Sequence, residues 1–132
     1  MSALTRYFFR SAVERSSAWN TVAWWESRRF IFNAVVGGAG LVTLGWVNLV
    51  SLVTAGSLVP IPWQVPLIYG AMANVCYTLG WTAELALHRL VGDDASTAGA
   101  TIFRYGFVFS VGLTLFPAVL VTLATVATLV FR

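Results

Sequence analysis

The sequence has few charged residues for its size. Only 10% of its 132 residues are Asp, Glu, Lys or Arg, whereas 58% are hydrophobic, and the mean hydropathy is +0.80. A soluble domain carries about 25% charged residues, so this chain has too little charge to cover the surface of a small water-soluble protein. The same shortage excludes an intrinsically disordered chain, because disordered segments are polar and charged. The composition therefore predicts an integral membrane protein.

Residue types that commonly carry chemistry are also scarce. The chain has no lysine, one histidine (His88) and one cysteine (Cys76). A single cysteine cannot form a disulfide within the chain, and one histidine without a second strong ligand nearby does not complete a zinc site. The sequence contains no phosphate-binding loop and no nucleophile–base set. We therefore expect no enzyme activity, no bound metal and no cofactor.

Two long stretches lack charge altogether. Residues 30–83 and 105–131 contain 54 and 27 residues without a charged side chain. A membrane-crossing helix needs about 20 apolar residues, so the first stretch predicts two spans and the second predicts one. Pro60, Pro62 and Pro66 break the helix between the first two spans, and this turn belongs at the membrane surface because lipid does not tolerate unpaired backbone groups. The predicted fold is an all-α integral membrane protein whose residues 30–132 form one three-span domain, with spans at about 30–58, 64–87 and 101–130.

The first 29 residues have a different character, with five arginines and two glutamates. Arg6, Arg10 and Glu14 recur every four residues and share one helical face, which predicts an amphipathic helix lying in the membrane interface. We expect the predicted anchor at headgroup level to consist of Trp24, Trp25, Arg28 and Arg29. Residues 1–29 are thus either an ordinary membrane anchor or a docking surface for a partner.

Arginine placement predicts the orientation. Five arginines precede the first span, none lies in the first loop, two flank the second loop (Arg89 and Arg104) and one ends the chain (Arg132). Positively charged loops stay in the cytoplasm, so we expect a cytoplasmic N-terminus and an external C-terminus. Arginine without lysine, together with many Ala, Val, Gly and Trp residues, is typical of a GC-rich bacterial genome. The expected location is the bacterial inner (plasma) membrane.

The second predicted span carries a polar stripe, which is formed by Asn74, Tyr77, Trp81, Glu84 and His88. Spacings of three and four residues place all five on one helical face. Because such a face is costly against lipid, it should point at protein or at a water-filled cavity. Glu84 is the only acid inside or near a span, and it is either a structural ion pair or a proton or cation site. The candidate ion-pair partners are Arg28, Arg29 and Arg104, and we expect one of them to join Asn33, Glu84 and His88 in a single cluster.

Small residues mark candidate contact faces between helices in lipid, where close packing replaces the hydrophobic driving force. The predicted packing residues are Ala34, Gly38, Ala39, Thr43, Gly70, Gly106 and Ser110. Pro117 lies within the third span and predicts a kink.

Three functions remain open at this point. The first is a non-enzymatic subunit that forms a homo-oligomer or joins a larger membrane complex through packing of its helices. The second is a homo-oligomeric pore or small transporter lined by the polar stripe. The third is lipid or quinone binding beside Tyr77 and Trp81. No feature of the sequence indicates nucleic-acid binding.

Overall fold

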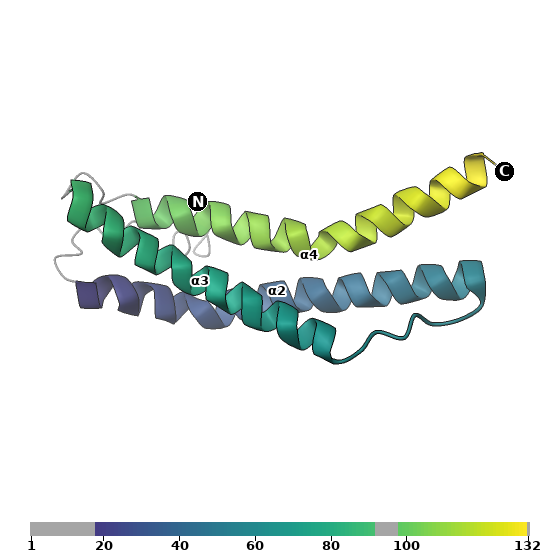
Figure 1. Cartoon of the computed structure of the whole chain (residues 1–132), viewed down its shortest axis with the longest axis horizontal. Helices are drawn as coiled ribbons and strands as arrows, with labels where there is room; N and C mark the ends of the chain where they lie inside the picture. Colours follow the sequence, from purple (N-terminus) through teal and green to yellow (C-terminus); the bar gives the residue numbers. More distant parts are fainter. Residues whose placement is uncertain (1–17, 92–97, 132) are drawn as a thin grey trace.

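The computed structural model describes residues 18–91 and 98–131 (Figure 1). Three α-helices account for almost all of this part of the chain: α2 (Ala18–Ala55), α3 (Gln64–Val91) and α4 (Ala98–Val130). Of these, α2 and α4 are long and apolar enough to cross a membrane, as judged by length and composition. The all-helical prediction is confirmed, with two such helices. The amphipathic pattern of Arg6, Arg10 and Glu14 lies outside the described residues.

The helix boundaries differ from the predicted spans mainly at one end. α2 is a single helix from Ala18 and passes through Arg28 and Arg29 without a break. The predicted division between residues 29 and 30 is therefore not a helix boundary, and residues 18–29 continue the first span. α3 begins at the predicted residue, Gln64, and continues to Val91. Arginine ends an apolar stretch without ending a helix, because its helix propensity is high.

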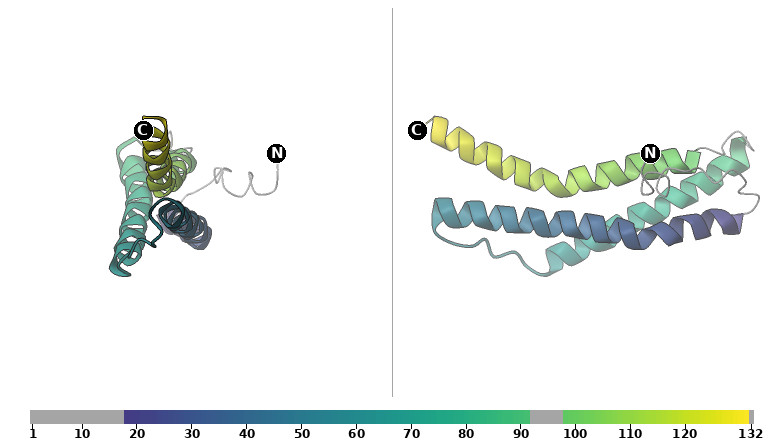
Figure 2. Two further views of the ribbon diagram at one scale, coloured as in Figure 1. Left: turned by 90° about the vertical axis from the view of Figure 1, so that its right-hand side faces the viewer. Right: turned by 180° about the vertical axis from the view of Figure 1, so that it is seen from behind.

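α2 and α4 run side by side in the same direction, and α3 crosses them in the opposite direction (Figures 1 and 2). The most extensive contact is that between α2 and α4. Trp25 of α2 lies against Phe103 of α4. Phe32, two turns further along α2, lies against Phe107, one turn further along α4. The two helices are therefore packed in parallel, starting from the end that carries the arginines.

The packed core lies toward this arginine end. It consists of five side chains that are at most 5% exposed: Trp25, Phe32, Val36, Tyr77 and Phe103. The ring centroids of Trp25 lie 5.3 Å from Tyr77 and 5.5 Å from Phe103, with steep angles between the ring planes. Edge-to-face pairs of this kind stabilise by about 0.5–1.5 kcal/mol each beyond the area that they bury. Aromatic packing thus fixes how the three helices meet.

The proline-rich connection between α2 and α3 is an extended strap. Gly56, with φ of 68°, ends α2 by donating its N–H to the carbonyl of Leu52, in the left-handed conformation that glycine adopts readily. The chain then runs back along α2, where the N–H of Val59 donates to Asn48 Oδ1 at 3.1 Å. α3 consequently starts beside the middle of α2 and leaves the far ends of α2 and α4 without a third helix (Figure 1).

The helices differ in how far they extend beyond the arginines. α2 runs from Phe30 to Ala55 without charge, which is about 39 Å at 1.5 Å per residue. α3 reaches Arg29 at Asn74 and Thr78, so only about 20 Å of it lies on the charge-free side. The hydrocarbon core of a bilayer is about 30 Å thick. α2 exceeds this thickness, whereas the part of α3 that extends beyond the level of Arg29 falls short of it.

Pro117 lies inside α4, which bends near its middle (Figure 1). Proline cannot donate to the carbonyl of Leu113. On the side facing α2, Thr43 Oγ1 donates to the carbonyl of Thr114 at 2.7 Å, and Tyr69 Oη lies 2.5 Å from Thr114 Oγ1. These contacts from α2 and α3 hold α4 at Thr114, three residues before Pro117.

Gly80 provides a direct test of this packing. A Cβ atom at Gly80 would lie 2.8 Å from Trp25 Cη2, whereas a Cβ at Gly106 would meet no atom within 4 Å. We expect Gly80→Ala to destabilise the protein by about 1–3 kcal/mol, because the buried indole has to move. Gly106→Ala should be neutral or stabilise by up to about 1 kcal/mol, as usual for an open helical position. Unfolding of both variants in detergent measures the difference, and equal stabilities would contradict the described contact.

Candidate functional site

Glu84 is the most deeply buried ionisable residue among those described, with no exposed surface. Trp25 Nε1 of α2 donates to Glu84 Oε2 at 2.5 Å. The first turn of α4 covers the same carboxylate so closely that a Cβ at Gly99 would lie 2.1 Å from Oε2. The beginning of a helix carries free N–H groups and partial positive charge, so it suits an acidic neighbour. Glu84 thus brings α2, α3 and α4 together at one point.

His88 lies one helical turn beyond Glu84 on α3. Its Nε2 is 3.7 Å from Glu84 Oε1, and its side chain is 24% exposed. This distance fits an ion pair but exceeds hydrogen-bond length, and Nε2 has no hydrogen-bond partner. Glu84 and His88 are therefore neighbours on one face of α3 with no hydrogen bond between them.

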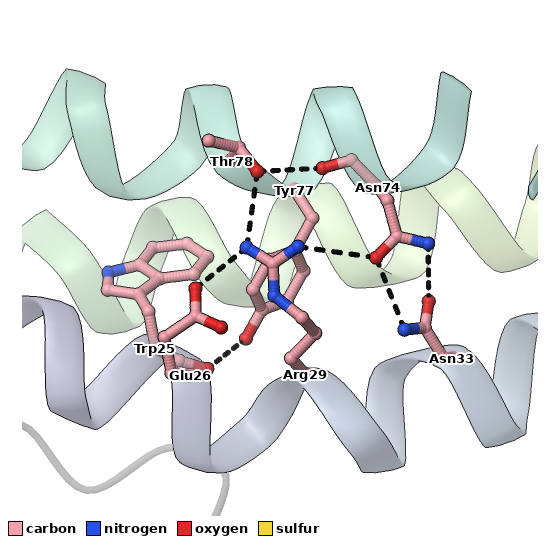
Figure 3. Close-up of polar contacts among 7 residues, drawn as sticks. All are labelled: Trp25, Glu26, Arg29, Asn33, Asn74, Tyr77 and Thr78. Atoms are coloured by element: carbon pink, nitrogen blue, oxygen red, sulfur yellow. Dashed lines mark hydrogen bonds and ion pairs between the residues drawn. The ribbon is translucent and has the colours of Figure 1, made fainter. Parts of the chain in front are cut away.

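A second polar group surrounds Arg29 (Figure 3). Arg29 Nη2 donates to Glu26 Oε1 at 2.7 Å and to Thr78 Oγ1 at 3.1 Å, while Nη1 lies 3.4 Å from Asn74 Oδ1. The side-chain amides of Asn33 and Asn74 donate to each other, at 3.2 and 3.0 Å. We call the five residues Glu26, Arg29, Asn33, Asn74 and Thr78 the polar patch. It connects α2 to α3 across the middle of α3.

Tyr77 lies between the polar patch and Glu84. Its side chain is 4% exposed, and its hydroxyl donates to the carbonyl of Trp25. The Arg29 guanidinium lies 5.0 Å from the centroid of its ring. One buried aromatic side chain thus separates the polar patch, which lies between α2 and α3, from Glu84, which also contacts α4.

The structure divides the predicted single cluster into these two groups. Asn33 contacts Asn74 on the Arg29 side and does not join Glu84 and His88. The carboxylate partner of Arg29 is Glu26, three residues earlier on the same helix, and not Glu84. The periodicity of α3 places its polar residues on one face, but it carries no information on how far α2 is shifted along that face. The stripe itself faces the other helices, with Tyr77 and Glu84 buried and Asn74, Trp81 and His88 half-buried.

One of the residues predicted to anchor the chain at headgroup level, Trp25, has another role. Trp25 is 2% exposed and belongs to the core, so it is not an interfacial anchor. Trp24 is half-buried beneath Arg28, whose guanidinium lies 4.0 Å from the ring and donates to the Trp24 carbonyl at 2.9 Å. Arg104 is an exposed residue of α4. A run of tryptophan and arginine is compatible both with a lipid interface and with a core, and only the neighbouring helices decide between them.

The predicted small-residue contacts are mostly absent within the chain. A Cβ at Gly38, Gly70 or Gly106 would meet nothing within 4 Å. Ala34 is exposed, Ala39 is half-buried, and Ser110 bonds the carbonyl of its own helix at Gly106. Thr43 is buried against α4, as described above. The close approaches occur instead at Gly80, which follows Cys76 by four residues, and at Gly99. The spacing of small residues on one helix does not identify Gly99, because the atoms next to it belong to another helix.

Trp25 and Trp81 provide a matched test of the Glu84 site. Trp25→Phe removes the donor to a buried carboxylate and should destabilise the protein by about 1.5–3 kcal/mol, the usual contribution of a hydrogen bond to a charged group, in addition to the lost packing. Trp81 Nε1 is buried without a hydrogen-bond partner, so Trp81→Phe loses only packing. Thermal unfolding in detergent should therefore show a clearly larger loss for Trp25→Phe, and losses of equal size would contradict the assigned hydrogen bond.

Among the described residues, no three His, Cys, Asp or Glu side chains lie close enough together to hold a metal ion. Comparison with known proteins gives no guide to the chemistry: no protein-family model, no curated protein and no solved structure matches the chain. What the site does must be inferred from its own residues.

Proposed function

We propose that the chain is a small non-enzymatic membrane protein that acts as a subunit of an oligomer or of a larger membrane complex. The observation that carries this proposal is the direction of the polar stripe on α3. Its two central members, Tyr77 and Glu84, are buried against α2 and α4 of the same chain. The polar groups of α3 therefore have a structural role within the subunit. Association with other chains then uses the apolar outer surface of the subunit.

The alternative, a pore lined by the stripe, has less support. In a ring of subunits, residues that line the lumen point away from their own bundle. Here Tyr77 bonds the backbone of α2, and Glu84 lies between α2 and the first turn of α4. Lining a lumen with these residues would require separating the three helices and losing the aromatic core around Trp25.

The outer face of α2 carries small residues that suit lateral association. Ala34, Gly38 and Gly45 are exposed, and a Cβ at either glycine would meet no atom of the chain within 4 Å. Small residues allow the backbones of two helices in lipid to approach closely. A glycine surface that contacts none of the described residues is therefore a suitable contact for the glycine surface of a second chain.

The proposal includes three crossings, with α3 as the shortest. A bilayer adapts to a short span by local thinning or by helix association. The exposed Trp63 beside the prolines suits the opposite headgroup layer. We further propose that residues 1–17 form an amphipathic interfacial helix, that the N-terminus is cytoplasmic, and that the membrane is the bacterial inner membrane.

A pair of reporter fusions tests the crossing number and orientation. Alkaline phosphatase is active only outside the cytoplasm, whereas green fluorescent protein fluoresces only inside it. We expect phosphatase activity and no fluorescence for fusions after Arg132. Fusions within the loop 92–97 should give the reverse result. A fluorescent fusion after Arg132 would contradict three crossings with a cytoplasmic N-terminus.

Gly38→Leu tests the lateral contact. The change adds a large side chain to the outer face of α2 and should weaken association without altering the fold, because nothing in the chain adjoins Gly38. Ala71→Leu on the exposed face of α3 is the control. Crosslinking in native membranes, followed by purification, should show the wild type and Ala71→Leu in the same assembly and a loss of that assembly for Gly38→Leu.

A flux measurement separates the subunit from the pore. Liposomes containing the purified protein should show no proton or cation flux above empty liposomes, and Glu84→Gln should leave this unchanged. A flux that Glu84→Gln alters would favour the pore and overturn the proposal. If Gly38→Leu and Ala71→Leu affected the assembly equally, the proposed contact at the outer face of α2 would be wrong.

A further inference from the structure

The polar patch opens on the side of α2 and α3 that faces away from α4. In Figure 3 its side chains lie between the α2 and α3 ribbons, with α4 passing behind them. Asn33 is exposed, and the side chains of Arg29 and Glu26 are 28% and 43% exposed. Exposed amides and charges within a span are costly against hydrocarbon. Their position requires either a headgroup layer or a polar ligand.

An apolar groove continues from the polar patch along the same two helices. Its volume is about 270 Å³, and its walls include Gly37 of α2 and Gly70 of α3, with Pro117 of α4 on its floor. Gly37 lies four residues after Asn33, and Gly70 lies four residues before Asn74, so each glycine shares a helical face with its asparagine. A Cβ at either glycine would meet nothing within 4 Å. No side chain therefore narrows the groove at these two positions next to the polar patch.

The combined length of patch and groove matches one leaflet. Arg29 and Leu44, the last α2 residue that lines the groove, are fifteen residues apart. This separation corresponds to about 22 Å along the helix, and one leaflet with its headgroup layer is about 20–22 Å thick. The surface is charged at one end, carries amides next and is apolar over the remainder, which is the polarity profile of a lipid molecule.

We propose that this face binds one zwitterionic phospholipid that has a primary ammonium group. The phosphate lies at Arg29, the ammonium donates to Glu26, and one acyl chain occupies the groove. Glu26 and Arg29 are 2.7 Å apart and have opposite charges, so together they complement a headgroup that also carries one charge of each sign. Asn74 Nδ2 donates both hydrogens, to Asn33 Oδ1 and to the carbonyl of Gly70, so it is the second hydrogen of the Asn33 amide that lies at the level of the ester carbonyls. This site requires only that α2 cross the bilayer with Arg29 near a headgroup layer, and it is independent of the subunit proposal.

Native mass spectrometry of the purified full-length chain tests the site. The protein in mild detergent is mixed with equal amounts of synthetic phosphatidylethanolamine, phosphatidylcholine and phosphatidylglycerol that carry the same acyl chains. We expect one bound lipid per chain, predominantly phosphatidylethanolamine. Glu26→Gln should lower its ratio to phosphatidylglycerol by about two- to fivefold, as expected for the loss of one partly exposed ion pair.

Gly37→Leu fills the groove and should reduce the retention of all three lipids. Ala71→Leu and Arg89→Gln, both at exposed positions of α3 outside the patch and the groove, are the size and charge controls and should retain the wild-type pattern. Retention of the three lipids in equal amounts, unchanged by Glu26→Gln and Gly37→Leu, would overturn the proposal. If Gly37→Leu dissociated a dimer and left lipid retention unchanged, the face would contact a second chain, and the proposal would also fail.

Discussion

The contact at Glu84 is the constraint on which the rest of the structure depends. A carboxylate with no exposed surface takes its hydrogen bond from Trp25 on α2 and lies under the first turn of α4. Leaving a buried carboxylate without such partners costs several kcal/mol, so the three helices cannot separate at this end without exposing or orphaning it. The rings of Trp25, Tyr77 and Phe103 pack around this point, and the glycines at 80 and 99 provide the space that they require. Polar and aromatic contacts thus replace the hydrophobic driving force that is weak between helices in lipid.

Side-chain packing is uneven along the bundle, and the two ends have different roles. The arginine end is held by the core and by the polar patch. Toward the other end, side chains of α2 and α4 such as Leu49, Val53, Leu123 and Leu129 remain at least half exposed. The stable end fixes the helix arrangement, while the apolar end is available to lipid or to another protein. This division is the physical basis of the proposed role as a subunit.

Much of the fold follows from the sequence, because charge-free length and proline are local properties. The helical class, the start of α3 at Gln64 and the interruption by Pro60 and Pro62 follow from these properties. The relative placement of helices does not, because it depends on which aromatic side chain fills which gap. Trp25 has the sequence context of a lipid anchor and becomes the donor to Glu84 only when α3 and α4 are in place. Asn33 has the depth expected for a Glu84 partner, yet the shift between α2 and α3 pairs it with Asn74.

The strap that begins at Gly56 also determines the shape that lipids meet. Because it returns along α2 before α3 begins, the proposed three-crossing arrangement places three helices in one leaflet and chiefly two in the other. The leaflet with two helices has room for additional lipid beside the protein. Such a wedge-shaped protein favours a membrane that bends toward the narrow side of the wedge. A single copy has little effect on curvature, whereas many copies gathered in one region would bend the membrane.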